Sequence, residues 1–147
     1  MSFKYRLEKI LTIREDELDE AILEMKKADD HLRAVTYELS STTERRNELH
    51  AELINEGITH ATLYIRKIKQ LNEKIAQLEK DIIAAQEALF KAKEAVKEAK
   101  MKLEALKRHK DKKHKDFIQE EDRKERIRLD EIGVLKHTRE LLESRES

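Results

Sequence analysis

Residues 61–106 read ATLYIRKIKQLNEKIAQLEKDIIAAQEALFKAKEAVKEAKMKLEAL. Apolar residues recur in this stretch at alternating steps of three and four, namely Ala61, Tyr64, Ile68, Leu71, Ile75, Leu78, Ile82, Ala85, Leu89, Ala92, Val96, Ala99, Leu103 and Leu106. A period of about 3.5 residues is typical of a coiled coil, because it keeps one face of a helix turned towards a partner helix. The rhythm then stops, since its next two places are Lys110 and Lys113.

Residues 7–53 carry the same rhythm and supply the expected partner helix. Its positions are Leu7, Leu11, Arg14, Leu18, Ala21, Met25, Ala28, Leu32, Val35, Leu39, Thr42, Arg46, Leu49 and Leu53. If the chain folds back at Gly57, Leu53 faces Ala61 and Leu7 faces Leu106, in one constant register. The seam of the second helix then ends because the first helix has ended.

These two seams predict an all-α fold, a two-helix antiparallel coiled-coil hairpin with a longer C-terminal helix. We expect one coiled-coil domain over residues 1–147, with a first helix over about 4–54, a turn over 55–60 and a second helix over about 60–142. Residues 107–142 would overhang the N-terminus. Gly57 is expected to end the first helix in left-handed backbone. Arg14, Thr42 and Arg46 interrupt the seam, and such polar layers exchange stability for register.

Composition supports long helices and excludes several other classes of protein. The 147 residues include no proline, two glycines and 44% charged side chains, with only 4% aromatic residues, which is not the composition of a compact globular domain. No cysteine is present, so a disulfide framework and a thiolate metal site are both excluded. No apolar run reaches the roughly 18 residues that cross a bilayer. We therefore expect a cytosolic protein.

The sequence offers no signature of catalysis or of cofactor binding. Its two glycines, Gly57 and Gly133, are isolated, so no phosphate-binding loop is present. His109 and His114 are five residues apart and do not share a helix face. A two-helix rod also has no cavity in which carboxylates would be desolvated for acid–base chemistry. We expect no enzyme activity, no cofactor, no metal and no small-molecule substrate.

Two segments beyond the seam leave alternatives open. Residues 107–116 carry six basic and two acidic side chains; they form a solvated helix face, a contact with an acidic partner or, as a third option, a nucleic-acid site. Balanced totals of 32 basic and 32 acidic residues argue against nucleic acid. Farther on lie Ile127, Leu129, Ile132, Val134, Leu135, Leu141 and Leu142. They indicate fraying or self-association, or a helix offered to another protein's groove, which we favour because an uncovered apolar stripe lowers solubility.

Two short stretches carry a resemblance to a known family. Residues 3–15, FKYRLEKILTIRE, resemble the start of the FliJ family, whose members begin with a Phe-x-x-x-Leu-x-x-x-Leu-x-x-Arg-Glu pattern. Residues 126–132, RIRLDEI, resemble the C-terminal Leu/Met-Asp-Glu stretch of the same family. Phe3 and the Asp130-Glu131 pair are the most specific matches, since heptad rules do not require them.

The resemblance implies a soluble component of the bacterial flagellar type III export apparatus, similar to the central stalk of rotary ATPases. Implied partners are the hexameric export ATPase, the cytoplasmic part of the export gate and export chaperones, so that the protein would associate peripherally with the cytoplasmic face of the inner membrane. The ATPase end would carry Phe3, Arg6, Leu7, Arg14, Leu129, Asp130, Glu131 and Ile132, and the tip facing the gate would carry Leu63, Tyr64 and Ile65. Alternatives are the related YscO-type injectisome stalk and a generic coiled-coil scaffold.

Overall fold

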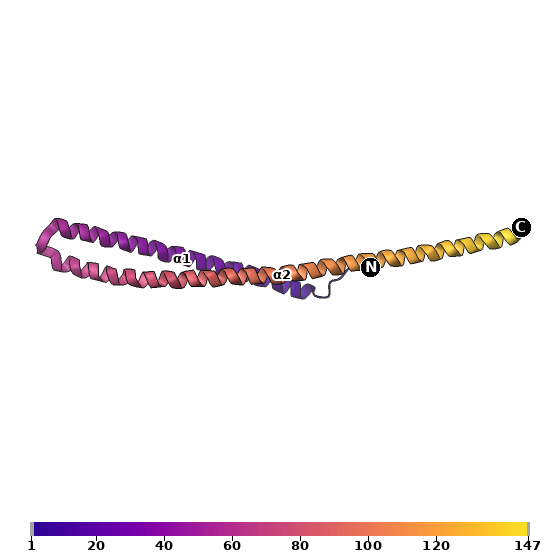
Figure 1. Cartoon of the computed structure of the whole chain (residues 1–147), viewed down its shortest axis with the longest axis horizontal. Coiled ribbons are helices and arrows are strands. Elements are labelled where there is room, and N and C mark those ends of the chain that lie inside the picture. Colours follow the sequence, from indigo (N-terminus) through magenta and orange to yellow (C-terminus); the bar gives the residue numbers. More distant parts are fainter. Residues whose placement is uncertain (1, 147) are drawn as a thin grey trace. The chain divides into compact units, whose positions relative to one another are not determined.

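The computed structural model describes residues 2–146, and every regular element in that range is helical. Helix α1 spans Glu8–Glu56, the short 3-10 helix η1 spans Gly57–His60 and helix α2 spans Ala61–Glu146 (Figure 1). The predicted all-α class is confirmed. By packing, the chain divides into a central unit, Arg14–Met101, and a terminal unit made of Met1–Ile13 and Lys102–Ser147.

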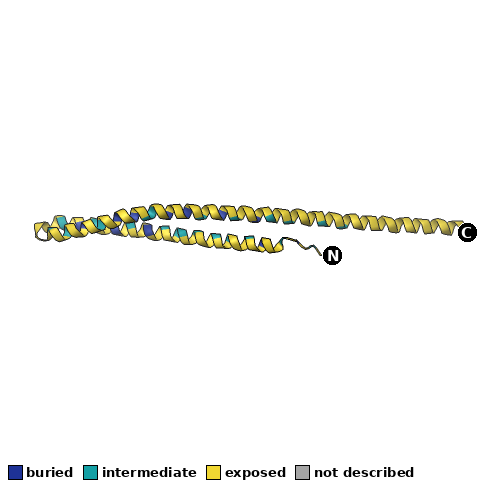
Figure 2. Cartoon of the chain, turned by 90° about the horizontal axis from the view of Figure 1, so that it is seen from below, coloured by how far each residue is buried: buried dark blue, intermediate teal, exposed yellow. Residues whose placement is uncertain are grey.

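In the central unit, α1 and the first part of α2 lie side by side and are joined through η1 (Figures 1 and 2). Gly57 adopts a φ of 70° directly after α1 ends, as expected for the residue that closes this helix. Polar contacts also join α1 to α2 in this unit. Lys74 Nζ lies 3.2 Å from Glu38 Oε1, Arg46 Nη1 donates to Asn72 Oδ1 at 3.2 Å, and the Tyr64 hydroxyl donates to Glu56 Oε2 at 2.8 Å.

Burial follows the predicted seams closely. Every seam position of both helices is buried or half-buried, and the most buried apolar side chains among them are Leu11, Val35, Leu49, Ile68, Ile75, Leu78, Ala85, Leu89, Val96 and Leu103. Most of the intervening residues are exposed (Figure 2). The apolar rhythm of the sequence therefore predicted correctly which face of each helix is covered.

One polar layer is buried inside the central unit. Thr42 is only 6% exposed, and its Oγ1 donates to the carbonyl oxygen of Glu38 at 2.7 Å. This bond satisfies the buried hydroxyl within α1, and the run of serine and threonine around it is helical. Arg46 Nε, by contrast, is a buried donor that has no hydrogen-bond partner in the described residues.

In the terminal unit, α1 begins at Glu8, later than the expected start near Lys4. Residues 2–5 have no regular structure, Arg6 and Leu7 form a turn, and the Glu8 N–H donates to the carbonyl oxygen of Tyr5 at 3.2 Å. The heptad rhythm assumes a helix and therefore gave no sign of this change of conformation.

Helix α2 continues through Gly133 to Glu146, four residues past its expected end near residue 142. Residues 122–146 are all exposed. No helix in residues 2–146 combines the length and the apolar character needed to cross a bilayer.

Candidate partner-binding surfaces

The non-helical residues Ser2–Leu7, here called the N-terminal strap, lie along α2 within the terminal unit. Tyr5 is only 9% exposed, and its hydroxyl lies 2.6 Å from His109 Nδ1, a hydrogen bond whose direction depends on the histidine tautomer. The two rings are 5.6 Å apart. Phe3 lies farther along α2, with its ring 4.9 Å from that of His114 and 5.5 Å from that of Phe117. These spacings are those of packed aromatic rings.

An ion pair fixes the junction between the strap and α1. Lys110 Nζ lies 2.9 Å from Glu8 Oε2, which gives this lysine a partner where the apolar rhythm had stopped. A groove runs between the strap and α2, lined by Phe3, Lys4, Tyr5, Arg6, Leu7, His109, Lys113, Asp116, Phe117, Glu120, Glu121 and Lys124. Residues 109–117, expected as part of a bare overhang, therefore carry the strap instead.

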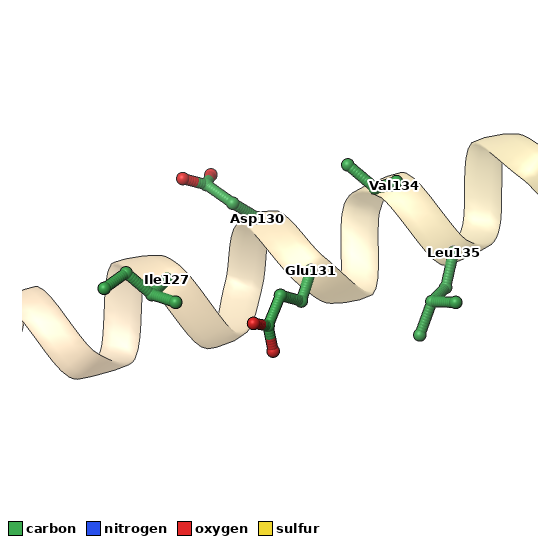
Figure 3. Close-up of a pocket in the computed structure, with 5 residues that line it drawn as sticks. All are labelled: Ile127, Asp130, Glu131, Val134 and Leu135. Atoms are coloured by element: carbon green, nitrogen blue, oxygen red, sulfur yellow. The ribbon is translucent and has the colours of Figure 1, made fainter.

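The exposed end of α2 presents apolar side chains on both sides of two adjacent carboxylates. A shallow depression is lined by Ile127, Asp130, Glu131, Val134 and Leu135. Figure 3 shows Asp130 and Val134 on one side of the helix and Glu131 and Leu135 on the other. No ion pair involves Asp130 or Glu131 in the described part of the chain.

Ion pairs one turn apart stabilise the same helix closer to the strap. Arg123 Nη2 lies 2.8 Å from Glu120 Oε1, and Arg128 Nη2 lies 2.9 Å from Glu125 Oε1. The hydrogen bonds from Arg123 lower the pKa of Glu120 below 4.5. Such pairs favour helix without a partner helix, which agrees with α2 remaining helical over the exposed residues 122–146.

The end of the central unit at η1 is the third candidate surface. Of the three residues proposed for a partner-binding tip, Leu63 and Ile65 are exposed and Tyr64 is half-buried. The Tyr64 hydroxyl donates to Glu56 Oε2 at 2.8 Å, and this bond raises the pKa of Tyr64 above 10.0. Ile54 and Ile58, 81% and 94% exposed, enlarge the apolar surface beyond the residues named from the sequence.

The residues proposed for an ATPase end are distributed unevenly. Phe3, Arg6 and Leu7 line the strap groove, whereas residues 129–132 lie on the exposed end of α2 and are not among the residues that line this groove. Arg14 belongs to the central unit, where its Nη1 pairs with Glu17 Oε2 at 2.9 Å. Of this set, Phe3, Arg6 and Leu7 are the residues that line one groove in the described part of the chain.

Sequence reasoning missed the aromatic contacts of the strap. Tyr5, His109, His114 and Phe117 were not proposed as site residues, although two signals were present. Phe3 and Tyr5 are two residues apart, which places both side chains on one side of an extended chain. Phe117 also continues the three–four rhythm after Lys110 and Lys113.

Helices α1 and α2 are long, and each buries the regularly spaced apolar face of its seam, which is the pattern of a coiled-coil protein. No group of three or more metal-binding side chains lies close together within residues 2–146.

Comparisons with known proteins give the family. A family model described as "Flagellar FliJ protein" matches residues 3–142, so the chain belongs to the flagellar FliJ family. This is a family of structural coiled-coil proteins of type III export. A solved structure of a YscO homolog from Chlamydia trachomatis is similar in fold, with a TM-score of 0.76 and 22% identity over 93% of this chain and 96% of that one. A comparison with curated proteins found no match.

Proposed function

We propose that this protein is a stalk of the flagellar type III export apparatus, binding the hexameric export ATPase and linking it to the export gate. The observation that carries this proposal is the family match over residues 3–142, which covers all of α1 and α2 as far as residue 142. In the proposal, α1 and α2 form one antiparallel coiled-coil hairpin, and the end of α2 extends past the N-terminus.

The terminal unit is the proposed ATPase end. It holds Phe3, Arg6 and Leu7 on the strap and the four residues 129–132 on the exposed end of α2. Asp130 and Glu131 support this assignment, since they are exposed carboxylates without ion pairs in the described residues, between apolar side chains that are also exposed. Exposed apolar groups beside unpaired charges are suited to a protein partner with basic side chains.

A coiled coil is a physically sensible insert for a ring. Two packed helices have a diameter of about 20 Å, so they suit a central channel too narrow for a globular domain. An asymmetric rod inside a six-fold ring contacts the six subunits unequally, and unequal contacts bias their conformations. The stalk would thereby promote assembly or turnover of the ring.

The exposed apolar tip is the proposed contact with the cytoplasmic part of the gate. It presents Leu63 and Ile65, with Ile54 and Ile58 beside them. Export chaperones are further proposed partners on the strength of the family alone. Through these contacts the protein would be cytoplasmic and peripherally associated with the inner face of the membrane.

The test is to mix the full chain with a purified export ATPase and to measure hydrolysis and hexamer formation. We expect both to increase, and the double reversal Asp130→Lys/Glu131→Lys to remove the increase. Asp19→Lys/Glu20→Lys is the matched control, because it reverses an adjacent pair of the same two residue types that is exposed in α1. No response to the unaltered chain, or equal loss in the control, would refute the assignment.

The hairpin needs a separate test, because a generic scaffold would use the same seams between two chains. Leu18 and Val96 face each other in the antiparallel register, and both are covered in the central unit. Cysteines at these two positions should form a disulfide within one molecule. In a parallel dimer residue 18 would instead lie beside residue 18 of the second chain.

The YscO homolog of similar fold supports one runner-up, a stalk of a virulence-type injectisome. The two systems predict different cognate ATPases. Stimulation of an injectisome ATPase, with none of the flagellar one, would favour the runner-up.

A further inference from the structure

The apolar rhythm of the seam resumes at the exposed end of α2. Continued beyond Leu106, its alternating steps reach Lys124, Ile127, Glu131, Val134, Thr138, Leu141 and Arg145. Ile127, Val134 and Leu141 are large apolar residues one heptad apart, and all three are exposed. The depression in Figure 3 lies on this face, since its lining consists of three of these positions and the two that flank them, Asp130 and Leu135. The end of α2 is thus half of a coiled coil.

We propose that residues 124–145 pair with the same residues of a second copy of this chain, in antiparallel orientation about a two-fold axis at Val134. The stretch is about 33 Å long. With the alternating steps of three and four that the seams follow, Val134 faces Val134 of the second copy. Ile127 then faces Leu141 of the second copy on either side, and Glu131 faces its Thr138. The three apolar layers are therefore regularly separated by two layers that bring no like charges together.

Charge selects the antiparallel orientation over the parallel one. A parallel pair in register would place Lys124, Glu131 and Arg145 each against its own copy, and like charges facing each other across a seam are destabilising. In the antiparallel pair the only like-charged layer is Lys124 with Arg145, at the two ends, where water screens it.

The flanking positions also agree with self-pairing. In the central unit Glu38 and Lys74, each one residue before a seam position, form an ion pair across the two helices. The equivalent geometry in the self-pair brings Asp130 beside His137 of the second copy. On the other flank Leu135 lies beside Leu135, which buries a side chain that is exposed in the single chain.

Self-pairing has a consequence for the proposed function, although it does not rest on that function. The pair would cover Asp130 and Glu131, the two carboxylates assigned to the ATPase. A chain bound to its own copy is then unable to bind the ATPase through them, so the two complexes exclude each other. Self-pairing would also cover an apolar stripe that otherwise favours non-specific aggregation.

The first experiment measures the mass of the full chain by light scattering over a hundredfold concentration range reaching about 1 mM. We expect the mass to rise from 17.4 kDa towards twice that value. Val134→Glu, which places two carboxylates at the two-fold axis, should remove the rise. Leu129→Glu is the matched control, because Leu129 is similarly exposed, 55% against 65%, but lies outside the rhythm. It should leave the rise unchanged.

The second experiment determines the relative orientation of the two paired helices. Because the sequence has no cysteine, any disulfide must involve the introduced cysteines. Ile127→Cys and Leu141→Cys chains should form mixed disulfides with each other, and Ile127→Cys chains alone should form few. Three results would overturn the proposal: a constant mass of 17.4 kDa at every concentration, loss of the rise in Leu129→Glu, or preferential linkage of Ile127→Cys chains to one another in the mixture. None of these measurements involves an ATPase, so a failed stalk assignment would not affect them.

Discussion

Tyr5 is the most buried residue of the strap, and Tyr5→Ala tests whether this side chain holds the strap against α2. Tyr5 is 9% exposed, and its ring contacts His109. Truncating a buried aromatic residue typically costs about 3–5 kcal/mol. Because the strap lies at the surface and relaxes easily, we expect about 2–3 kcal/mol here. The population of chains with a detached strap should then rise about 30- to 150-fold.

Tyr5→Phe separates the ring from the hydroxyl. It keeps the packed ring and removes only the hydrogen bond to His109 Nδ1. A single neutral hydrogen bond contributes about 1 kcal/mol, which corresponds to roughly a fivefold increase in detachment. The expected order of detachment is therefore Tyr5→Ala, then Tyr5→Phe, then the unaltered chain.

Tryptic cleavage after Arg6, followed by mass spectrometry, is a suitable assay, because cleavage of a transiently opened segment reports the population of the open form. Rates should be corrected with short peptides of the same sequences, which have no strap to detach. Tyr37→Ala is the control, since Tyr37 is 77% exposed. If Tyr5→Ala is cleaved no faster than Tyr37→Ala, Tyr5 does not hold the strap.

Three further outcomes are expected. Leu49 is only 3% exposed, so Leu49→Ala should lower the free energy of unfolding by about 2–3 kcal/mol in a denaturant titration. Ile54 is 81% exposed, so Ile54→Ala should change this free energy by less than about 0.5 kcal/mol. Equal effects of the two substitutions would contradict the difference in burial. Arg46→Leu should raise the thermal midpoint followed by circular dichroism, because it removes a buried Nε without a partner; a lower midpoint would show that the bond to Asn72 matters more. Glu56→Ala should lower the pKa of Tyr64 towards 10.0 in an absorbance titration of a chain with the other two tyrosines replaced by phenylalanine. Since the raised pKa favours the protonated phenol, any stabilisation is present below pH 10.0 and is lost as the pH rises through the raised value.

Much of the fold could be read from the sequence, because a coiled coil repeats one simple rule. The rhythm identified the buried or half-buried positions of both helices, polar ones such as Thr42 and Arg46 included. Gly57 was recognised as the end of α1 because a φ of 70° is easily adopted by glycine alone. Leu63 and Ile65, named from the sequence as tip residues, are exposed, and their partner stays a prediction.

The candidate site was predicted less completely. The rhythm indicated that the seam ends at Lys110, yet Lys110 is half-buried and paired with Glu8. Arg14 was grouped with Phe3 on the family pattern; it belongs to the central unit and pairs with Glu17, and its place in a partner-binding site stays a prediction. A family pattern gives residues in order along the chain, and it carries no information on which unit each residue joins.

The sequence by itself determined that the chain is helical and which face of each helix is covered. An apolar period of about 3.5 residues matches one face of an α-helix packed against a partner helix. Only the tertiary structure decided that residues 2–7 leave the helix and place Phe3 beside His114 and Phe117. The physical reason is a difference in rise. An extended chain advances about 3.3 Å per residue and a helix about 1.5 Å. Extended residues therefore reach farther along α2 than the same residues would in a continued helix, and Phe3 contacts aromatic rings that the helical pattern did not predict.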